Sequence, residues 1–336
     1  TTETYTLSLH DALPISDRTI STTMLGQTVS MPTALAPVGL SGMQWANGEI
    51  HAAHAAEKFG VPYCLSTMSI CSIEDVAEAA SKPFWFQLYM MRDRDFIKRL
   101  ILRARAAECS ALVLTADLQI MGQRHKDIKN GLSTPPKLTI ANLIDMARHP
   151  AWSLRMFGTR QHSFGNILGH IDGARNLSSL AAWTAEQFDP ALSWDDVKWV
   201  KDIWQGPLVI KGIMTPEDAL LASDAGADAI VVSNHGGRQL DGAPASIDVL
   251  AEIVSCINGQ TEVWFDGGIR SGQDILRAIA LGAKATLIGR AYQYGLGALG
   301  EAGVTRSLEI LSRELDLTMA FCGLKDINQV DQKILV

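Results

Sequence analysis

The sequence is poor in the features that mark metal-binding, membrane-spanning and nucleic-acid-binding proteins. Its cysteines form no CxxC pair, which argues against zinc and iron–sulfur sites; they stand at positions 64, 71, 109, 256 and 322. No run of about 18 apolar residues occurs, so no transmembrane helix is expected, and no secretory signal pattern is present. The net charge of −7 argues against a general nucleic-acid binder. We therefore expect a cytoplasmic protein with reduced cysteines and no bound metal.

What is present suffices for a large core. The chain has 336 residues, of which 47% are hydrophobic, enough for one large α/β domain or two smaller ones. Residues 1–16, TTETYTLSLHDALPIS, show no clear strand or helix period, and part of this stretch resembles translated adapter sequence. We expect residues 1–16 to be foreign to the fold, with an ordinary frayed terminus as the alternative. We expect residues 17–336 to form a single domain.

Short apolar runs alternate with helical stretches along the rest of the chain. The runs cover residues 33–39, 61–67, 84–90, 111–117, 207–213, 229–234, 262–268 and 285–290. Continuous apolar runs predict strands covered on both faces, as in a parallel sheet. Eight units in regular rhythm favour a closed (β/α)8 TIM barrel over the alternative, a doubly wound open sheet. The hairpin-like stretch 21–32 is expected to close the bottom of the barrel.

A long insertion interrupts this rhythm after the fourth strand, at residues 118–192. It contains eight lysine or arginine residues against five acidic ones, a net charge of +3, whereas the rest of the chain carries −10. Within it, residues 141–158 (ANLIDMARHPAWSLRMFG) form an amphipathic, basic stretch. This pattern predicts either a lid over the site or a surface that meets an anionic membrane.

Polar residues, together with a proline and two glycines, gather at the ends of the predicted strands, where barrel enzymes carry their active sites. In chain order they are Pro37 and Gly39; Ser66 and Thr67; Gln87 and Tyr89; Thr115 and Asp117; Lys211; Ser233, Asn234, His235 and Arg238; Asp266 and Arg270; and Gly289 and Arg290. Each could singly be a satisfied core polar group. Convergence at so many strand ends favours a site.

Two subsets of these residues have a clear chemical use. The glycine-rich turns at 266–274 and 288–291 predict a phosphate cradle, with charge added by Arg270 and Arg290. In SNHGGRQLDG (233–242), Arg238 together with Arg124 could clamp a carboxylate. His235 beside them could act as a base, and Asp117 could orient its imidazole ring.

These motifs, SNHGGRQLDG, WFQLY, LTAD, VIKGI and DGGIRSG…IGRA, together resemble the FMN-dependent α-hydroxy acid dehydrogenase family from about Ser21 to the C-terminus. LAPVGLSGM, the segment from 188 to 213 and the basic insertion are most similar to its bacterial L-lactate dehydrogenase branch. Mandelate dehydrogenases and glycolate oxidases are near neighbours. The resemblance implies FMN as cofactor, an L-2-hydroxy acid such as L-lactate as substrate, and a quinone or other respiratory electron acceptor. It further implies a homo-oligomer and a peripheral position on the inner face of the inner membrane.

The resemblance also implies a role for each residue. His235 corresponds to the base, Asp117 to its carboxylate partner, Tyr89 to a substrate-binding tyrosine, and Arg124 and Arg238 to the arginines that bind the substrate carboxylate. The expected cofactor contacts are Pro37, Val38, Gly39, Ser66, Gln87, Thr115, Lys211, Ser233, Asp266, Gly267, Gly268, Arg270, Gly289 and Arg290. Lys211 would stabilise an anionic reduced flavin.

Two points depart from the family or stay open. The family's usual N-terminal segment with a second substrate tyrosine has no counterpart, and Tyr5 stands in no matching context. The alternatives to an L-lactate dehydrogenase are a mandelate dehydrogenase, an oxidase that uses O2, and an inactive flavin-binding barrel or fragment. The residues do not decide between transfer of a hydride and formation of a carbanion.

Overall fold

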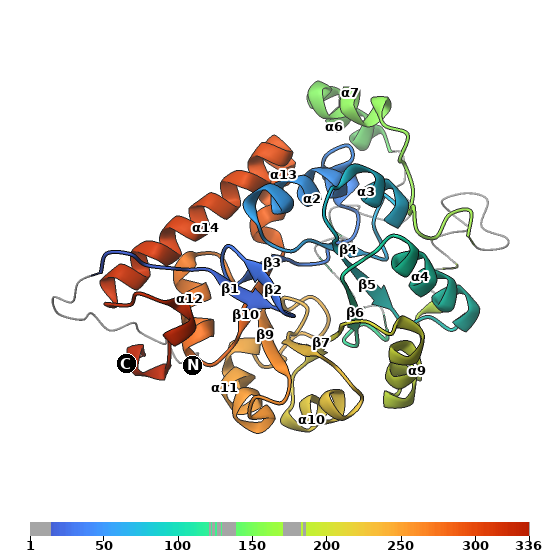
Figure 1. The fold of residues 1–336 in the computed structure, drawn as a ribbon. Coiled ribbons are helices and arrows are strands. Elements are labelled where there is room, and N and C mark those ends of the chain that lie inside the picture. The colour runs from blue at the N-terminus through green and yellow to red at the C-terminus, as the bar shows by residue number, and fades with distance from the viewer. Residues whose placement is uncertain are drawn as a thin grey trace.

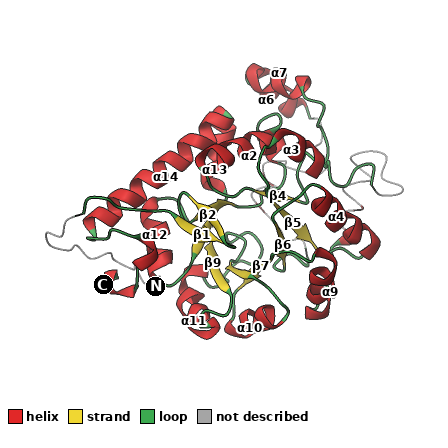
Figure 2. Cartoon of the chain, in the orientation of Figure 1, coloured by secondary structure: helices red, strands yellow, loops and turns green. Residues whose placement is uncertain are grey.

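The computed structural model describes residues 15–120, 139–170 and 186–335, together with residues 122, 125, 129 and 183. Its centre is one sheet of parallel strands, surrounded by helices (Figures 1 and 2). The sheet strands are β3 (Thr33–Leu35), β4 (Cys64–Ser66), β5 (Trp85–Tyr89), β6 (Ala111–Thr115), β7 (Leu208–Ile213), β8 (Ala229–Val232), β9 (Glu262–Asp266) and β10 (Ala285–Ile288). All eight predicted strands are confirmed.

The sheet closes into a (β/α)8 barrel. Its order is β3-β10-β9-β8-β7-β6-β5-β4, and a parallel bridge between Leu35 and Tyr63 joins the two outer strands. The observed strands are shorter than several of the apolar runs. β3, for example, ends at Leu35, although the run continues to residue 39. The run residues after Leu35 leave the sheet and form a loop at its carboxyl edge.

The helices follow the predicted alternation. They are α1 (Ser41–Gln44), α2 (Gly48–Phe59), α3 (Ile73–Ala79), α4 (Arg94–Ala106), α6 (Ile140–Arg148), α7 (Pro150–Gly158), α9 (Trp194–Trp204), α10 (Pro216–Asp224), α11 (Ser246–Ile257), α12 (Gly272–Ala280), α13 (Arg290–Leu299) and α14 (Glu301–Phe321). Two 3-10 turns, Ile327–Gln329 and Gln332–Ile334, follow. Local sequence sets several ends: Thr215 caps α10 ahead of Pro216, and Gly60 ends α2 at φ 86°.

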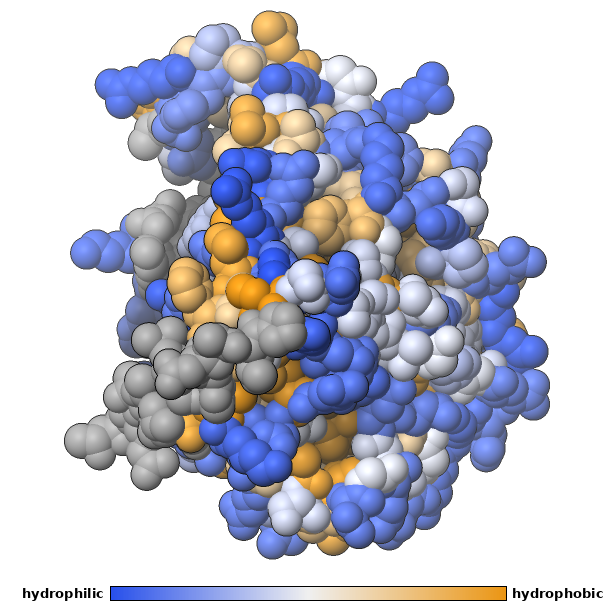
Figure 3. All heavy atoms as spheres, turned by 60° about the vertical axis from the view of Figure 1, so that its left-hand side comes forward, coloured by the Kyte–Doolittle hydropathy of each residue, from blue (hydrophilic) through white to orange (hydrophobic). Residues whose placement is uncertain are grey.

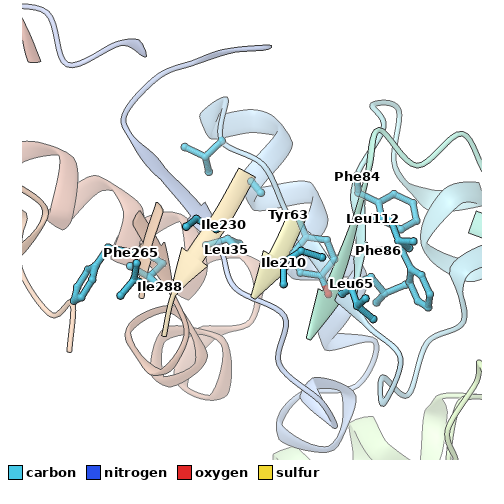
Figure 4. Packing of buried hydrophobic residues seen from close by; sticks show 14 of the residues in the cluster. Leu35, Tyr63, Leu65, Phe84, Phe86, Leu112, Ile210, Ile230, Phe265 and Ile288 are labelled. Carbon is cyan, nitrogen blue, oxygen red and sulfur yellow. The ribbon is translucent and has the colours of Figure 1, made fainter. Parts of the chain in front are cut away.

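Alternate residues of each strand supply two separate cores. One set, including Leu65, Phe86 and Ile210, points outward and packs under the helices (Figure 4). The other set points into the barrel, where Trp85 and Trp264 stack with ring centroids 5.1 Å apart. Both faces of the sheet are therefore buried, which explains the continuous apolar runs.

The predicted hairpin closes the barrel. Strands β1 (Thr22–Met24) and β2 (Gln27–Val29) pair antiparallel. Met24 and Val29 are buried in the same cluster as the inward-facing strand residues. This leaves the carboxyl ends of the strands as the end at which a site can form.

The described part of the insertion contributes a helical pair above the barrel, labelled α6 and α7 in Figure 1. Pro150 at the start of α7 separates it from α6, so the amphipathic stretch forms two helices. Trp152 of α7 donates a hydrogen bond to the Met43 carbonyl (3.1 Å), and the Arg155 guanidinium lies 3.8 Å from a Trp45 ring centroid. α7 is thereby attached to the segment that follows β3. No helix within the described ranges has the length and hydrophobicity needed to cross a bilayer.

Candidate active site

The imidazole of His235 and the carboxylate of Asp117 meet at the carboxyl ends of β8 and β6. His235 Nδ1 lies 2.8 Å from Asp117 Oδ1, and both side chains are largely buried. His235 itself has a left-handed φ of 58°, which is uncommon for a residue other than glycine. Its backbone N–H donates to Ser233 Oγ (3.1 Å), which helps to hold this conformation. The aspartate therefore fixes one ring nitrogen, Nδ1, and with it the orientation of the ring.

Gly212 in β7 makes the approach of Asp117 to the sheet possible. Its φ is 108°, and the pairing of β7 with β8 shifts register between Lys211 and Ile213. A Cβ at Gly212 would lie 2.7 Å from the Asp117 Cβ, closer than side chains pack. Sequence reasoning missed this residue. The only available signal was a glycine inside an apolar strand, which often marks a bulge or a close approach.

Lys211 lies at the centre of a buried charge network. Its Nζ is 3.2 Å from Asp266 Oδ2, 3.9 Å from Asp117 Oδ2, and donates to Ser233 Oγ at 3.0 Å. Ser233 in turn donates to Asp266 Oδ1 (2.5 Å). One cation thus lies between two carboxylates contributed by β9 and by the end of β6.

This network shifts the pKa values of its members. Burial disfavours the Lys211 ammonium, but the charges of Asp266 and Asp117 outweigh burial, and the pKa of Lys211 is raised. Burial alone would raise the pKa of Asp117, but the nearby Lys211 charge and the His235 hydrogen bond keep that pKa below its usual value. Lys211 is therefore charged, and Asp117 is ionised, at neutral pH.

Gln87 anchors a second group of buried polar side chains. Its Oε1 accepts from Ser66 Oγ (3.1 Å) and from the Thr67 backbone N–H (3.3 Å), and its Nε2 donates to Thr115 Oγ1 (3.0 Å). Ser66, Gln87 and Thr115 are each at most 3% exposed. Three adjacent strands, β4, β5 and β6, are thus connected by one row of donors and acceptors.

The predicted phosphate cradle lies at the ends of β9 and β10. Gly267 and Gly268 have φ values of 105° and 96°, and no heavy atom lies within 4 Å of a Cβ built on Gly268. Gly289 is the N-cap of α13, so unpaired backbone N–H groups begin there. Arg290 is exposed and donates to the Gly236 carbonyl (3.0 Å), next to His235. Arg270 is also exposed, at the start of α12.

The turn after β3 completes this rim. Pro37, Val38 and Gly39 are half-buried. A Cβ on Gly39 would lie 3.1 Å from the Met68 Cβ, so the turn passes close to the one after β4. The structure therefore brings the turns after β3, β4, β9 and β10 to the same end of the barrel as His235.

The remaining predicted substrate residues come from β5, from the loop that carries His235 and from the insertion. Tyr89 ends β5, and its ring meets Phe188 edge-on with centroids 5.7 Å apart. Arg238 is exposed, three residues after His235 in the same loop. Arg124 lies outside the described residues. Phe188, which sequence reasoning also missed, joins the site through an antiparallel bridge with Met91.

The residues present fit the FMN expected from the resemblance. The open backbone at Gly268 and Gly289, with two exposed arginines, suits a phosphate. The buried row around Gln87, together with Lys211, supplies the few polar groups that orient a flat ring in an otherwise apolar wall. Among the described residues, no cluster of histidine, cysteine and acidic side chains has the geometry of a metal site.

Comparison with known proteins agrees with this reading of the fold and cofactor. The L-lactate dehydrogenases of two strains of Caulobacter vibrioides are each 46% identical over 317 residues, which cover 94% of this chain and 82% of the relative. The crystal structure of the monotopic membrane protein (S)-mandelate dehydrogenase superposes with a TM-score of 0.93 at 36% identity, covering 99% of this chain and 88% of that one. A mandelate oxidase structure gives a TM-score of 0.81 at 37% identity, covering 97% and 84%. The family described as FMN-dependent dehydrogenase matches residues 3–336, and the chain belongs to that family.

Proposed function

We propose that the protein oxidises an L-2-hydroxy acid, L-lactate to pyruvate in the first instance, with His235 as the base. The contact of His235 Nδ1 with Asp117 Oδ1 at 2.8 Å is the observation that carries the chemistry. The choice of substrate is supported by the names of the relatives, L-lactate dehydrogenase and (S)-mandelate dehydrogenase. A mandelate dehydrogenase remains the second candidate, because the (S)-mandelate dehydrogenase structure covers 99% of this chain.

In this proposal His235 accepts a proton from the substrate at Nε2. Asp117, ionised because Lys211 and His235 lower its pKa, keeps a proton on Nδ1 and stabilises the imidazolium that forms. The proton can come from the hydroxyl group or from the α-carbon. The pair of His235 and Asp117 suits removal of either proton, since each reaction needs a base of fixed orientation.

The substrate would be oriented by Arg238, Arg124 and Tyr89. A guanidinium binds a carboxylate through two parallel hydrogen bonds, which fixes direction as well as distance. Tyr89 carries a phenol group at the end of β5, and the Phe188 ring packs edge-on against it. Together these residues would hold the α-carbon of a small acid next to His235.

The cofactor would be held from both sides of the barrel mouth. FMN, when bound, supplies the two-electron acceptor. We propose that Gly267, Gly268, Arg270, Gly289 and Arg290 bind its phosphate. Ser66, Gln87, Thr115 and Lys211 would line its ring, and Pro37, Val38, Gly39, Ser233 and Asp266 would complete the contacts. Lys211 would act by its charge, which Asp266 and Asp117 maintain.

We further propose that the helical pair α6–α7 rests on a membrane, where the enzyme passes electrons to a quinone. Ile140, Leu143 and Ile144 of α6 are 49–79% exposed, and Leu154 and Phe157 of α7 are 73% and 75% exposed. The top of Figure 3, where this pair lies, mixes hydrophobic and hydrophilic residues. Residues 139–170 contain three arginines and one acidic residue. An apolar face flanked by cations suits the interface of an anionic bilayer, such as the inner face of the inner membrane.

The proposal extends to the organisation of the chain. Residues 17–336 would form one FMN-binding domain that assembles as a homo-oligomer, and residues 1–16 would stand outside it. Residues 1–14 lie outside the described residues.

Anaerobic mixing of the holoenzyme with a panel of hydroxy acids tests the proposed function. L-lactate should bleach the bound flavin faster than (S)-mandelate, glycolate or D-lactate at equal concentration. A faster reaction with (S)-mandelate would identify the protein as a mandelate dehydrogenase. If none of the acids bleached the flavin, an inactive flavin-binding barrel would be favoured. Stoichiometric hydrogen peroxide in air would identify an oxidase in place of a quinone-linked dehydrogenase.

A further inference from the structure

Glu49, the second residue of α2, is a buried carboxylate outside the chemistry proposed above. It is 0% exposed. Its Oε1 accepts hydrogen bonds from the backbone N–H groups of Gly42 (2.9 Å) and Ile70 (3.0 Å). Among the described residues its Oε2 is buried without a hydrogen-bond partner. Burying a carboxyl group costs free energy, so its presence here calls for a function.

The two N–H groups belong to two different turns of the barrel mouth. Gly42 lies in α1, directly after the turn formed by residues 37–39. Ile70 lies in the turn after β4, the strand that ends at Ser66. One oxygen atom therefore joins the segments that follow two neighbouring strands, and both segments carry proposed FMN contacts.

Other contacts depend on the same junction. The Leu40 N–H donates to the Met68 carbonyl (3.0 Å), so the two turns already run against each other. A Cβ on Gly42 would lie 2.7 Å from the Ile70 Cβ and 2.8 Å from Glu49 Oε2. A side chain at position 42 would therefore require α1, Ile70 or the Glu49 carboxylate to shift.

We propose that Glu49 is a positioning residue for the FMN site, holding the turn after β3 against the turn after β4. It acts through the backbone at Gly42 and Ile70 and contacts neither cofactor nor substrate. The inference rests on the proposed cofactor contacts at residues 37–39 and Ser66. It is independent of the substrate, because FMN follows from the family.

The test measures FMN affinity by diluting the holoenzyme and following the fluorescence of released FMN. In Glu49→Ala the Kd for FMN should rise roughly tenfold or more, the scale expected when buried N–H groups lose their acceptor. Glu49→Gln retains an oxygen acceptor and should recover much of the affinity. Gly42→Ala should also weaken FMN binding, although the Glu49 carboxylate remains in this variant.

Asp228→Ala is the matched control. The Asp228 carboxylate accepts from the Leu208 backbone N–H (2.8 Å) and from Lys201 (2.6 Å), just before β8 at the opposite end of the barrel. This variant should lower the melting temperature without changing the Kd for FMN. A wild-type Kd in folded Glu49→Ala would overturn the proposal, as would an equal loss in Asp228→Ala. If Glu49→Ala fails to fold, a wild-type Kd in Gly42→Ala would overturn it.

Discussion

His235 Nδ1 and Asp117 Oδ1 lie 2.8 Å apart although 118 positions separate the two residues in the chain. β6 delivers the carboxylate and β8 delivers the imidazole, with β7 between them in the sheet. The strand between them contributes Gly212, whose lack of a side chain lets Asp117 come close. A histidine in a fixed orientation beside an ionised carboxylate is the arrangement that a general base needs.

Asp117→Asn should slow reduction of the bound flavin by about 10²-fold or more, the scale expected for a disabled acid–base pair. The amide can no longer stabilise the imidazolium by its charge. Stopped-flow absorbance under anaerobic conditions measures the rate. Asp241→Asn, an exposed carboxylate in the same loop as His235, is the control and should reduce at the wild-type rate.

The lowered pKa of Asp117 predicts how stability depends on pH. A carboxyl group whose folded pKa lies below its usual value of 3.8 contributes stability that is present above that value and is lost as the pH falls through the folded pKa. His235→Gln removes the imidazole that interacts with this carboxyl group, and the charge of Lys211 still lowers the pKa of Asp117. In that background the difference in melting temperature between Asp117 and Asp117→Asn, both saturated with FMN, should therefore stay constant from about pH 8 to pH 5. A difference that shrinks within this range would mean that the pKa of Asp117 is raised.

Arg238→Lys keeps a positive charge and loses the planar fork that binds a carboxylate with two hydrogen bonds. Both KM and kcat should worsen, because position as well as attraction is lost. Steady-state kinetics with L-lactate and with its methyl ester separate the two effects. The ester carries no carboxylate, so an equal loss with acid and ester would rule out the clamp.

The exposed apolar side chains of α7 should bind anionic vesicles. We expect sedimentation with vesicles at low salt and release at high salt, because surface electrostatics are screened. Replacing Leu154 and Phe157 with serine should abolish binding and leave flavin reduction intact. Phe321→Ser, on the exposed face of α14, removes a side chain of comparable exposure (67%) and should have no effect on vesicle binding. Wild-type protein that stays in the supernatant at low salt would contradict the membrane proposal.

Much of the barrel and the centre of the site could be predicted from the sequence. The buried strands of a closed parallel barrel appear in the sequence as continuous apolar runs. The polar residues at their carboxyl ends must lie at the same end of the barrel. This is why His235, Asp117 and Lys211 could be grouped without a structure.

The supporting residues could not be predicted, because they depend on the paths of loops. Glu49 reads as an ordinary acidic residue in the first turn of a helix, a position that the helix dipole favours. Phe188 reaches Tyr89 only because the end of the long insertion returns to the end of β5. Contacts of this kind leave no periodic pattern in the sequence.

The most direct test of His235 as the base is the rate at which L-lactate reduces bound flavin in His235→Gln. The variant should retain FMN, because the proposed phosphate and ring contacts lie on other residues. Anaerobic stopped-flow mixing should show flavin reduction slowed by about 10²–10⁴-fold relative to the wild type at equal FMN content. A variant that contains FMN and is reduced at close to the wild-type rate would contradict the assignment of His235 as the base.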